Sequence, residues 1–481
     1  MRPPLAAAIV VTAIPLFMAT LDNLVVVFAL PVIKSHLGGS AEAMQWVVNA
    51  FTLSYTALLL TFAALGDRFG RRRLFAIGIA LFTVASIMSA LASSTAMLIT
   101  ARVIQGAGAA AIVPLSLTLL GAAVPPKMRD VAIGLWGGVN GLGVAVGPVV
   151  SGAVVQGLAW QWIFWINVPL GVAVLPIMWR TLRESHGSER TLDPIGLVLS
   201  ATGIFALTWG ITRSDSHGWS SGQTLGMMIA GVVLIVAFLL WQARTRTPMM
   251  PLRLFRIRAF AFLNLAALTW TFGVFGSVFL LAQFFPDVQG FGPLAAGVRA
   301  MPWTMLPMVT APVFTFLIGK LGAKLIVSSG LAMQAIALAW LALVTGVHVP
   351  YTTLLPSFLL GGAGLGMSLA PMATVVLSST PEGDHGKASG INNTVRELGI
   401  ALGIAVLAAV FAAKGGYGSP QTFVNGLVPA LWVGAAVLAV GTMFALRLPG
   451  PTGAPAFPAR AAKKAAEKAA TAGKVVDSAV R

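Results

Sequence analysis

The sequence has no cysteine, and only 9% of its residues are charged. Without cysteine, the chain has no disulfide framework, thiol nucleophile or cysteine-based metal site, and its redox compartment stays open. A soluble domain does not need the apolar fraction that remains, because 57% of the 481 residues are hydrophobic. We therefore expect an all-α polytopic membrane protein.

Signals for metal and nucleotide sites are also scarce. Histidines are scattered in or beside expected loops and do not form a metal-ligand pattern; they are His36, His186, His217, His348 and His385. The nearest approach to a nucleotide-binding loop, PEGDHGKA, has Pro381 in place of the first glycine and Ala388 in place of Ser or Thr. We expect no metal, no cofactor and no enzymatic activity, with an ion gradient as the energy source.

Apolar stretches of a length that crosses ~30 Å of hydrocarbon recur along the chain. We predict fourteen spans, at Leu5–Ile33, Trp46–Leu65, Leu74–Leu91, Met97–Gly121, Val131–Leu158, Ile163–Met178, Ile195–Ile211, Leu225–Trp241, Phe260–Phe285, Gly297–Leu317, Leu325–Thr345, Leu354–Ser378, Ala388–Ala412 and Leu427–Leu446. The first stretch is too long for the apolar region of a signal peptide and is expected to be retained. An even number of spans puts both termini on one side.

Basic residues indicate which side that is. Most of the 31 Lys and Arg lie near the two termini or in the even-numbered turns, as in Arg71–Arg73 and Arg253–Arg258. Because basic loops stay cytoplasmic, we expect both termini in the cytoplasm and the protein in the plasma (inner) membrane. The net charge of +17 then serves topology and contact with anionic lipid, and nucleic acid is not an expected partner.

Two neighbouring spans repeat later in the chain at one offset. The offset pairs Ala132, Gly134, Gly143 and Gly147 with Ala388, Gly390, Gly399 and Gly403. Duplicated halves are typical of transporters. We predict a six-helix half at residues 1–180, a linker with two additional helices at 181–258, a second six-helix half at 259–448, and a basic, Ala/Lys-rich cytoplasmic tail at 449–481.

Charges inside the predicted spans are candidate functional residues, because a buried charge is costly in a bilayer. Asp22 lies midway along the first span, where a low dielectric favours its protonated form. We interpret it as a proton carrier that also meets a cationic substrate; the alternative is a carboxyl used for helix packing. Glu397, in the thirteenth span, is a second candidate for proton or substrate contact, or else a member of an ion pair.

Three polar residues near these acids carry further hypotheses. Arg102 lies at a depth comparable with that of Asp22 and is predicted either to exchange a contact with it, and so to take part in proton coupling, or to bind backbone carbonyls. Asn392 and Asn393, one turn before Glu397, are candidate substrate contacts. They could equally pack between helices.

Six motifs, in order, resemble those of the major facilitator superfamily, in its fourteen-helix drug/proton antiporter branch. These are LDNLVVVFALP from Leu21, LGDRFGRRRL from Leu65, LITARVIQGAGAA from Leu98, GVAVGPVVSG from Gly143, WQWIFWINVPLG from Trp160 and GINNTVRELGIALG from Gly390. The first motif has Leu24 and Val27 where the branch usually has Thr and Asn, so we expect a less polar setting for Asp22.

The resemblance assigns roles outside the charged spans. It implies a gating latch that closes the cytoplasmic face, formed by Asp67, Arg68, Gly70 and Arg71, with Asp130 as an available partner of Arg71. It also associates an antiporter motif with Gly143, Gly147, Pro148 and Gly152, which act through close helix contact and a kinked backbone.

The function implied is proton-coupled efflux of lipophilic, often cationic, compounds by alternating access of two halves. The expected partners are these small substrates, protons and membrane lipid, and the protein is expected to act as a monomer. Two alternatives stay open: an exporter restricted to one antibiotic, lipid or metabolite, and a membrane sensor that transports nothing.

Overall fold

The computed structural model describes residues 5–38, 41–125, 128–157, 159–187, 193–217, 221–245 and 248–449. The predicted tail after Pro449 lies outside these residues. The regular structure within them is helical, in the order α1 (Leu5–Leu37), α2 (Ala41–Phe69), α3 (Arg71–Ala90), α4 (Thr95–Ala123), α5 (Arg129–Gly157), α6 (Trp162–Trp165), α7 (Asn167–Thr181), α8 (Pro194–His217), α9 (Gly222–Arg244), η2 (Leu252–Arg256), α10 (Arg258–Asp287), α11 (Pro293–Val344), α12 (Tyr351–Ser378), η3 (Glu382–Asp384), α13 (His385–Lys414) and α14 (Pro420–Ala445).

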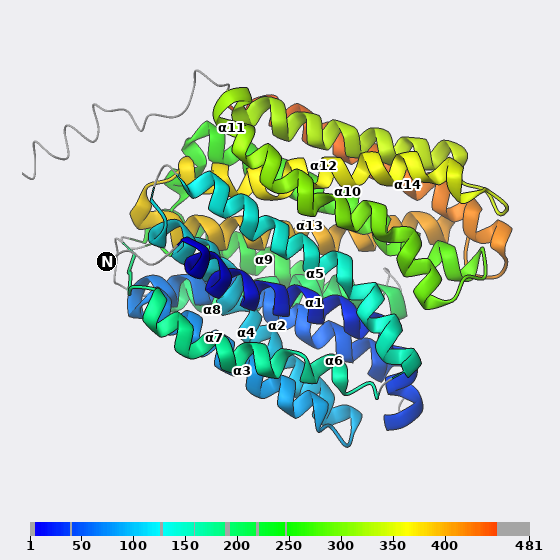
Figure 1. Cartoon of the computed structure of the whole chain (residues 1–481), viewed down its shortest axis with the longest axis horizontal. Coiled ribbons are helices and arrows are strands. Elements are labelled where there is room, and N and C mark those ends of the chain that lie inside the picture. Colours follow the sequence, from blue (N-terminus) through cyan, green and yellow to red (C-terminus); the bar gives the residue numbers. More distant parts are fainter. Residues whose placement is uncertain are drawn as a thin grey trace, which may run out of the picture.

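The helices form two bundles that lie side by side (Figure 1). In the first, α4 packs against α2 and α3, and α1 packs against α5; in the second, α10 packs against α13 and α14, and α11 against α12 and α14. The α5–α11 and α2–α13 contacts join the bundles, while α8 contacts α2, α9 and α13. The two additional helices therefore attach where α2 meets α13.

Twelve helical segments of the described residues are long and apolar enough to cross a membrane. The 52-residue α11 contains two of the predicted stretches, which meet at a kink where Gly322 has φ +80°. In α5, the apolar segment found among the described residues is shorter, Val131–Gly143. The chain is a multi-pass membrane protein, and the break in α11 at Gly322 falls between two of the predicted stretches.

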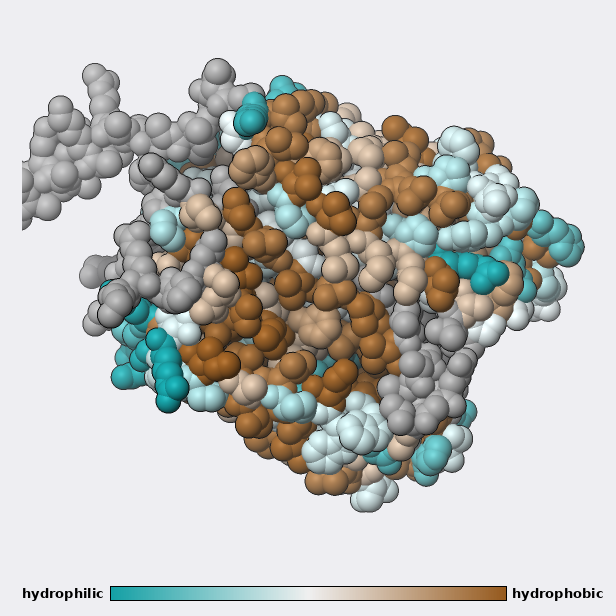
Figure 2. All heavy atoms as spheres, in the orientation of Figure 1, coloured by the Kyte–Doolittle hydropathy of each residue, from teal (hydrophilic) through white to brown (hydrophobic). Residues whose placement is uncertain are grey.

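The surface carries the apolar belt that a membrane requires. Hydrophobic residues cover the middle of the face in Figure 2, and hydrophilic residues gather toward its two ends. Large apolar side chains on α9 are exposed, including Val232, Val233, Val236 and Leu240, and α9 is the least buried of the twelve segments. Because lipid tails are as apolar as these side chains, their exposure has no cost in a bilayer.

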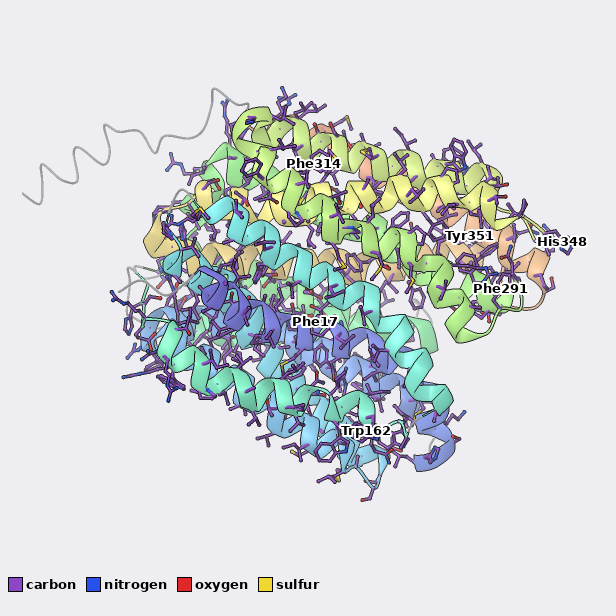
Figure 3. The ribbon with its side chains drawn as sticks, viewed as in Figure 1. Phe17, Trp162, Phe291, Phe314, His348 and Tyr351 are labelled. Atoms are coloured by element: carbon purple, nitrogen blue, oxygen red, sulfur yellow. The ribbon has the colours of Figure 1, made fainter. Side chains whose placement is uncertain are left out.

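The two ends of the bundle differ. We call the end where α1 begins and α2 meets α3 the basic end, because it carries Arg71–Arg73 and Arg253. There the bundles are in contact: the Ser389 hydroxyl of α13 donates to the Pro114 carbonyl of α4 over 3.2 Å. Toward the other end the ribbons diverge, with Trp162 on one bundle and Phe291 and Tyr351 on the other (Figure 3). The conformation is therefore closed at the basic end.

The tight turn between α2 and α3 depends on Gly70. Its φ of +110° lies where L-residues are strained, and the Glu184 carboxyl occupies the space that a Cβ at this position would take. Glu184 in turn accepts hydrogen bonds from the backbone N–H groups of Arg72 (2.8 Å) and Arg73 (3.3 Å), which begin α3. A side chain at Gly70 would strain the turn and displace the group that satisfies the helix N-terminus.

We predict that Gly70→Ala lowers the free energy of unfolding by about 1–3 kcal/mol, the cost of a strained backbone position. The measurement is the thermal unfolding midpoint of the purified protein in detergent. Gly226→Ala on α9 is the matched control, because no atom lies near the position of its Cβ. An equal midpoint for the Gly70 variant and the parent would contradict this account of the turn.

Candidate functional site

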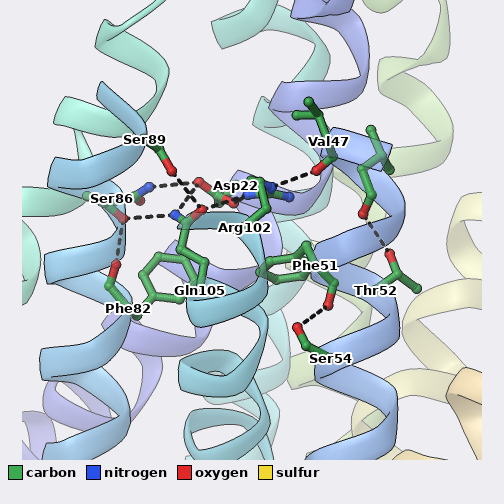
Figure 4. Close-up of polar contacts among 12 residues, drawn as sticks. Asp22, Val47, Phe51, Thr52, Ser54, Phe82, Ser86, Ser89, Arg102 and Gln105 are labelled. Carbon is green, nitrogen blue, oxygen red and sulfur yellow. Dashed lines mark hydrogen bonds and ion pairs between the residues drawn. The ribbon is translucent and has the colours of Figure 1, made fainter. Parts of the chain in front are cut away.

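Asp22, on α1, is surrounded by polar side chains from three other helices of the first bundle. Its carboxylate forms an ion pair with Arg102 of α4, and its Oδ1 accepts hydrogen bonds from the Gln105 Nε2 and the Asn167 Nδ2, each at 3.1 Å. Gln105 Nε2 also donates to the Ser86 hydroxyl over 2.9 Å. Figure 4 shows Asp22, Ser86, Arg102 and Gln105 of this cluster. With Asn167, the contacts connect α1, α3, α4 and α7.

Arg102 is held by further contacts on the side facing α2. Its Nε donates to the Val47 carbonyl over 3.1 Å, and one Nη donates to Gln105 Oε1 over 2.9 Å. The guanidinium carbon lies 4.4 Å from the centre of the Phe51 ring, a cation–π geometry. Both predicted contacts of Arg102 are therefore present together, one with Asp22 and one with a backbone carbonyl.

The prediction of a less polar setting for Asp22 rests on Leu24 and Val27, whose side chains lie outside the described residues. Asp22 is 1% exposed and Arg102 is fully buried, so the carboxyl is enclosed by a guanidinium and two amide donors. The proton-carrier role of Asp22 stays a prediction. The site also lies within the first bundle, so the substrate contact predicted for Asp22 has no support from this geometry.

Glu397 lies where the two bundles meet. Its carboxyl, on α13, interacts electrostatically with the Tyr55 hydroxyl of α2 and with Arg396. Arg396 extends its guanidinium over the Trp270 ring of α10, 5.2 Å from the ring centre, and the Trp270 indole N–H donates to Gln334 over 3.0 Å. The two candidate acids therefore occupy different places, Asp22 inside one bundle and Glu397 between the bundles.

Asn392 and Asn393 are used in packing. The Asn392 amide donates to Asn264 Oδ1 of α10 over 3.2 Å. The Asn393 amide donates to the Ser389 carbonyl of its own helix over 2.9 Å. Both side chains are buried, which matches the packing alternative for this pair.

Asp67 lies at the basic end, between the two bundles. Its Oδ1 accepts a 2.8 Å ion-paired hydrogen bond from Arg71 Nε, and its carbonyl accepts from the Gly187 N–H over 2.8 Å. Gly386, in the first turn of α13, packs so closely that a Cβ there would overlap the Asp67 carboxyl. A carboxylate at the start of a helix is stabilised by its dipole. Within the predicted latch, Arg71 thus pairs with Asp67, and Asp67 contacts α13 of the second bundle. Asp130, the partner predicted for Arg71, has its side chain outside the described residues.

The segment between α9 and α10 also binds the start of α13 at the basic end. Arg253 Nη2 pairs with both carboxylate oxygens of Asp384, at 3.1 and 2.9 Å. Lys387 Nζ donates to the Pro248 carbonyl over 2.9 Å. Asp384 precedes α13 and is 2% exposed, so this linker holds the beginning of α13 beside Asp67.

The antiporter motif of α5 is described in part. Gly143 is buried against the Phe17 carbonyl and Thr20 of α1, and its lack of a side chain allows the close α1–α5 contact. Gly147 is also buried. Asp130, Pro148 and Gly152 fall at positions of α5 whose side chains lie outside the description. Arg68, half-buried at the end of α2, stacks over the adjacent Phe69 ring at 5.1 Å.

Several contacts at these sites were absent from the sequence prediction. Gln105, Asn167 and Phe51 complete the surroundings of Asp22 and Arg102, while Tyr55 and Trp270 border the Glu397 region. Gln105 and Asn167 lie inside two of the motifs quoted above, and this was the only sequence signal that pointed to them. Phe51 and Tyr55 are two aromatic residues four positions apart on an apolar helix, a pattern that packing alone also produces. Among the described residues, no group of three or more His, Asp or Glu side chains could hold a metal.

The sequence matches the Major Facilitator Superfamily model over residues 12–404 and 304–473. It is 35% identical to the multidrug resistance protein Stp of Mycobacterium tuberculosis, over 84% of this chain and 75% of that protein. It is 32% identical to the tetracenomycin C resistance and export protein of Streptomyces glaucescens, covering 87% and 78%, and 30% identical to the multidrug efflux pump LfrA of Mycolicibacterium smegmatis, covering 90% and 86%.

Solved structures share the architecture. The human organic anion transporter MFSD10 superimposes with a TM-score of 0.65 at 14% identity, over 92% of this chain and all of that one. The proton:xylose symporter XylE gives 0.63 at 16% identity, over 93% and 96%. At these identities the likeness shows the fold alone. This chain belongs to the major facilitator superfamily, whose members are transporters and not enzymes.

Proposed function

We propose that this protein is a proton-coupled antiporter that exports lipophilic, often cationic, compounds. The observation that carries the proposal is the pair of separated acids: Asp22, ion-paired to Arg102 inside one bundle, and Glu397, at the contact between bundles. Related proteins are named as a multidrug resistance protein, a multidrug efflux pump and a tetracenomycin C resistance and export protein. Two acids in different environments allow one to exchange a proton while the other meets the substrate.

The two acids suggest an order of events. With the basic end closed, Asp22 is ionised and held by Arg102; a proton arriving from outside neutralises the carboxylate and releases the guanidinium. The basic end then opens, a cation enters from the cytoplasm to reach Glu397, and Asp22 loses its proton to the cytoplasm. The access change follows from a difference in free energy between ligand states, with no covalent step.

We further propose fourteen spans, with both termini in the cytoplasm and the protein acting as a monomer. The two arms of α11, which meet at Gly322, would count as separate spans, and α5 would be another. The basic end is then cytoplasmic, as the distribution of Lys and Arg requires. In this arrangement α8 and α9 are the two additional helices, and the exposed apolar face of α9 meets lipid.

A narrower substrate range is the second candidate. One relative is named for tetracenomycin C alone. A panel of lipophilic cations and neutral antibiotics, tested for growth protection in an efflux-deficient host, separates the two: protection against several unrelated compounds supports multidrug export, and protection against a single compound supports the narrow alternative.

The gating role of the latch gives a further prediction. Asp67→Asn removes the charge that Arg71 and the start of α13 share, so the initial transport rate should fall roughly tenfold, within the usual range of coupling free energies. Binding of a lipophilic cation in detergent should be unchanged. Arg73→Gln is the control in the same turn, since its side chain is mostly exposed and its distance to Glu184 is 3.8 Å. Parallel losses of binding and transport in Asp67→Asn would refute a gating role.

The experiment that tests the proposed function uses inverted membrane vesicles. Tetraphenylphosphonium uptake is measured with the membrane potential clamped, with and without an acidic lumen. An antiporter accumulates the cation only with the pH gradient. Uptake that is independent of this gradient, or absent under both conditions, would reject proton-coupled export.

A further inference from the structure

We infer that Phe51 and Tyr55 form a coupling stripe on α2 that connects the Asp22–Arg102 pair with Glu397. The inference rests on the proposed function and adds the residues through which the proton site and the cation site affect each other. Phe51 acts through the Arg102 guanidinium and Tyr55 through the Glu397 carboxyl, so both would be positioning residues.

The stripe follows from helical spacing. Val47, Phe51 and Tyr55 are four residues apart along α2, so their side chains lie on one face. The rings of Phe51 and Tyr55 are stacked, with centres 6.0 Å apart and planes inclined by 25°. Phe51 is 2% exposed and Tyr55 is 8% exposed, so the rings contact protein along the whole stripe.

One end of the stripe holds Arg102. The Val47 carbonyl accepts from its Nε at 3.1 Å, and the Phe51 ring lies under its guanidinium at 4.4 Å. Gly106, one turn further along α4, packs on the Phe51 carbonyl, where any side chain would overlap the backbone. A shift of α2 at Phe51 therefore displaces the guanidinium that neutralises Asp22.

The other end of the stripe crosses to the second bundle. Here α2 packs against α13, and the Tyr55 hydroxyl interacts electrostatically with Glu397, as does Arg396. On the far side, Trp270 supports Arg396 and is itself fixed by Gln334, whose Nε2 donates to the Ser368 hydroxyl over 3.1 Å. Arg396 is thus held firmly in the second bundle by Trp270 and Gln334. Movement of one bundle relative to the other therefore shifts Tyr55 relative to Glu397.

Through these contacts, binding of a cation at Glu397 can weaken the binding of a proton at Asp22. A cation at Glu397 competes with Arg396 and draws the carboxylate from Tyr55, and the stacked Phe51 ring follows Tyr55 toward the position that holds Arg102 on Asp22. Arg102 then favours loss of the proton. The charged and titratable groups facing the stripe are Asp22 and Arg102 at one end, and Arg396 and Glu397 at the other. Contiguity alone does not establish coupling, so the test measures the coupling itself.

The test is a double-mutant cycle on tetraphenylphosphonium affinity, measured with the full-length protein in detergent at neutral pH. Asp22→Asn imitates the protonated acid and should weaken cation binding about tenfold, within the usual range for coupled sites. In a Phe51→Leu background the same Asp22 substitution should change the affinity by less than about twofold. Phe51→Tyr keeps a ring beneath Arg102 and should preserve the tenfold effect.

Phe62→Leu is the matched control, because Phe62 lies on the same helix and packs against the apolar core of the first bundle. It should leave the tenfold effect intact, and Tyr55→Phe, which removes only the hydroxyl, should reduce it. If the Asp22 substitution still weakens cation binding tenfold in the Phe51→Leu background, the coupling stripe is wrong. In that case, pH-driven uptake by the parent would still support the proposed antiport. Loss of that uptake, or of cation binding, in the parent would reject both.

Discussion

Replacing Asp22 with Asn is expected to abolish pH-driven efflux of lipophilic cations. The variant keeps the shape of the side chain and an oxygen that accepts from Gln105 and Asn167, but it cannot release a proton. Arg102 retains Gln105, the Val47 carbonyl and the Phe51 ring, so the protein should still fold with reduced stability. Initial uptake into inverted vesicles should fall to that of vesicles without the protein.

Glu397→Gln separates the two acids in the same assay. It removes the charge between the bundles and leaves the Asp22–Arg102 pair untouched, so uptake of cations should fall while a neutral substrate is still exchanged for protons.

The outcome that would contradict the role of Asp22 is cation uptake by Asp22→Asn at the parental rate, normalised to the amount of folded protein. Asp22 would then be a packing residue.

Arg102→Leu should have the largest effect on stability. It leaves the Asp22 carboxylate buried without its counter-ion, and breaking one partner of a buried pair typically costs about 3–5 kcal/mol. Thermal unfolding in detergent at neutral pH measures the loss. Acidic pH should restore part of it, because protonation removes the uncompensated charge.

The double variant Asp22→Asn/Arg102→Leu is the control for that interpretation. Because it removes both charges, it should be more stable than Arg102→Leu alone. Equal midpoints for the single and double variants would show that the loss comes from packing around the arginine and not from the orphaned carboxylate.

The helical architecture could be predicted from the sequence because a bilayer imposes two simple demands. A spanning segment must be apolar over ~30 Å, and its backbone must satisfy its own hydrogen bonds. Each predicted apolar stretch coincides with helical structure, with α6 and α7 together covering Ile163–Met178. The exceptions are single terminal residues: Leu91, Thr345 and Leu446 lie one residue past a helix end, and Leu158 lies outside the described residues. The break in α11 also follows the sequence: Lys320 and Lys324 indicate a turn between two stretches, and the backbone leaves the helical conformation at Gly322, with φ +80° and ψ 150°.

The contacts of the site could be predicted only where two residues lie at the same depth in the bilayer. Comparable depth on antiparallel spans indicated Arg102 as a partner for Asp22, and the structure joins them. Depth does not fix the rotation of a helix about its axis. For that reason the sequence did not predict that Asn167 of α7 and Phe51 of α2 complete the cluster, or that Asn392 turns toward α10.

Proton release on cation binding tests the central claim most directly. Tetraphenylphosphonium is added to the purified protein in weakly buffered detergent solution, and the pH change is followed with an indicator dye. The parent should release protons in proportion to bound cation, Glu397→Gln should bind less cation, and Asp22→Asn should release none at saturating cation. Proton release from Asp22→Asn equal to that of the parent would contradict the assignment of Asp22 as the proton carrier.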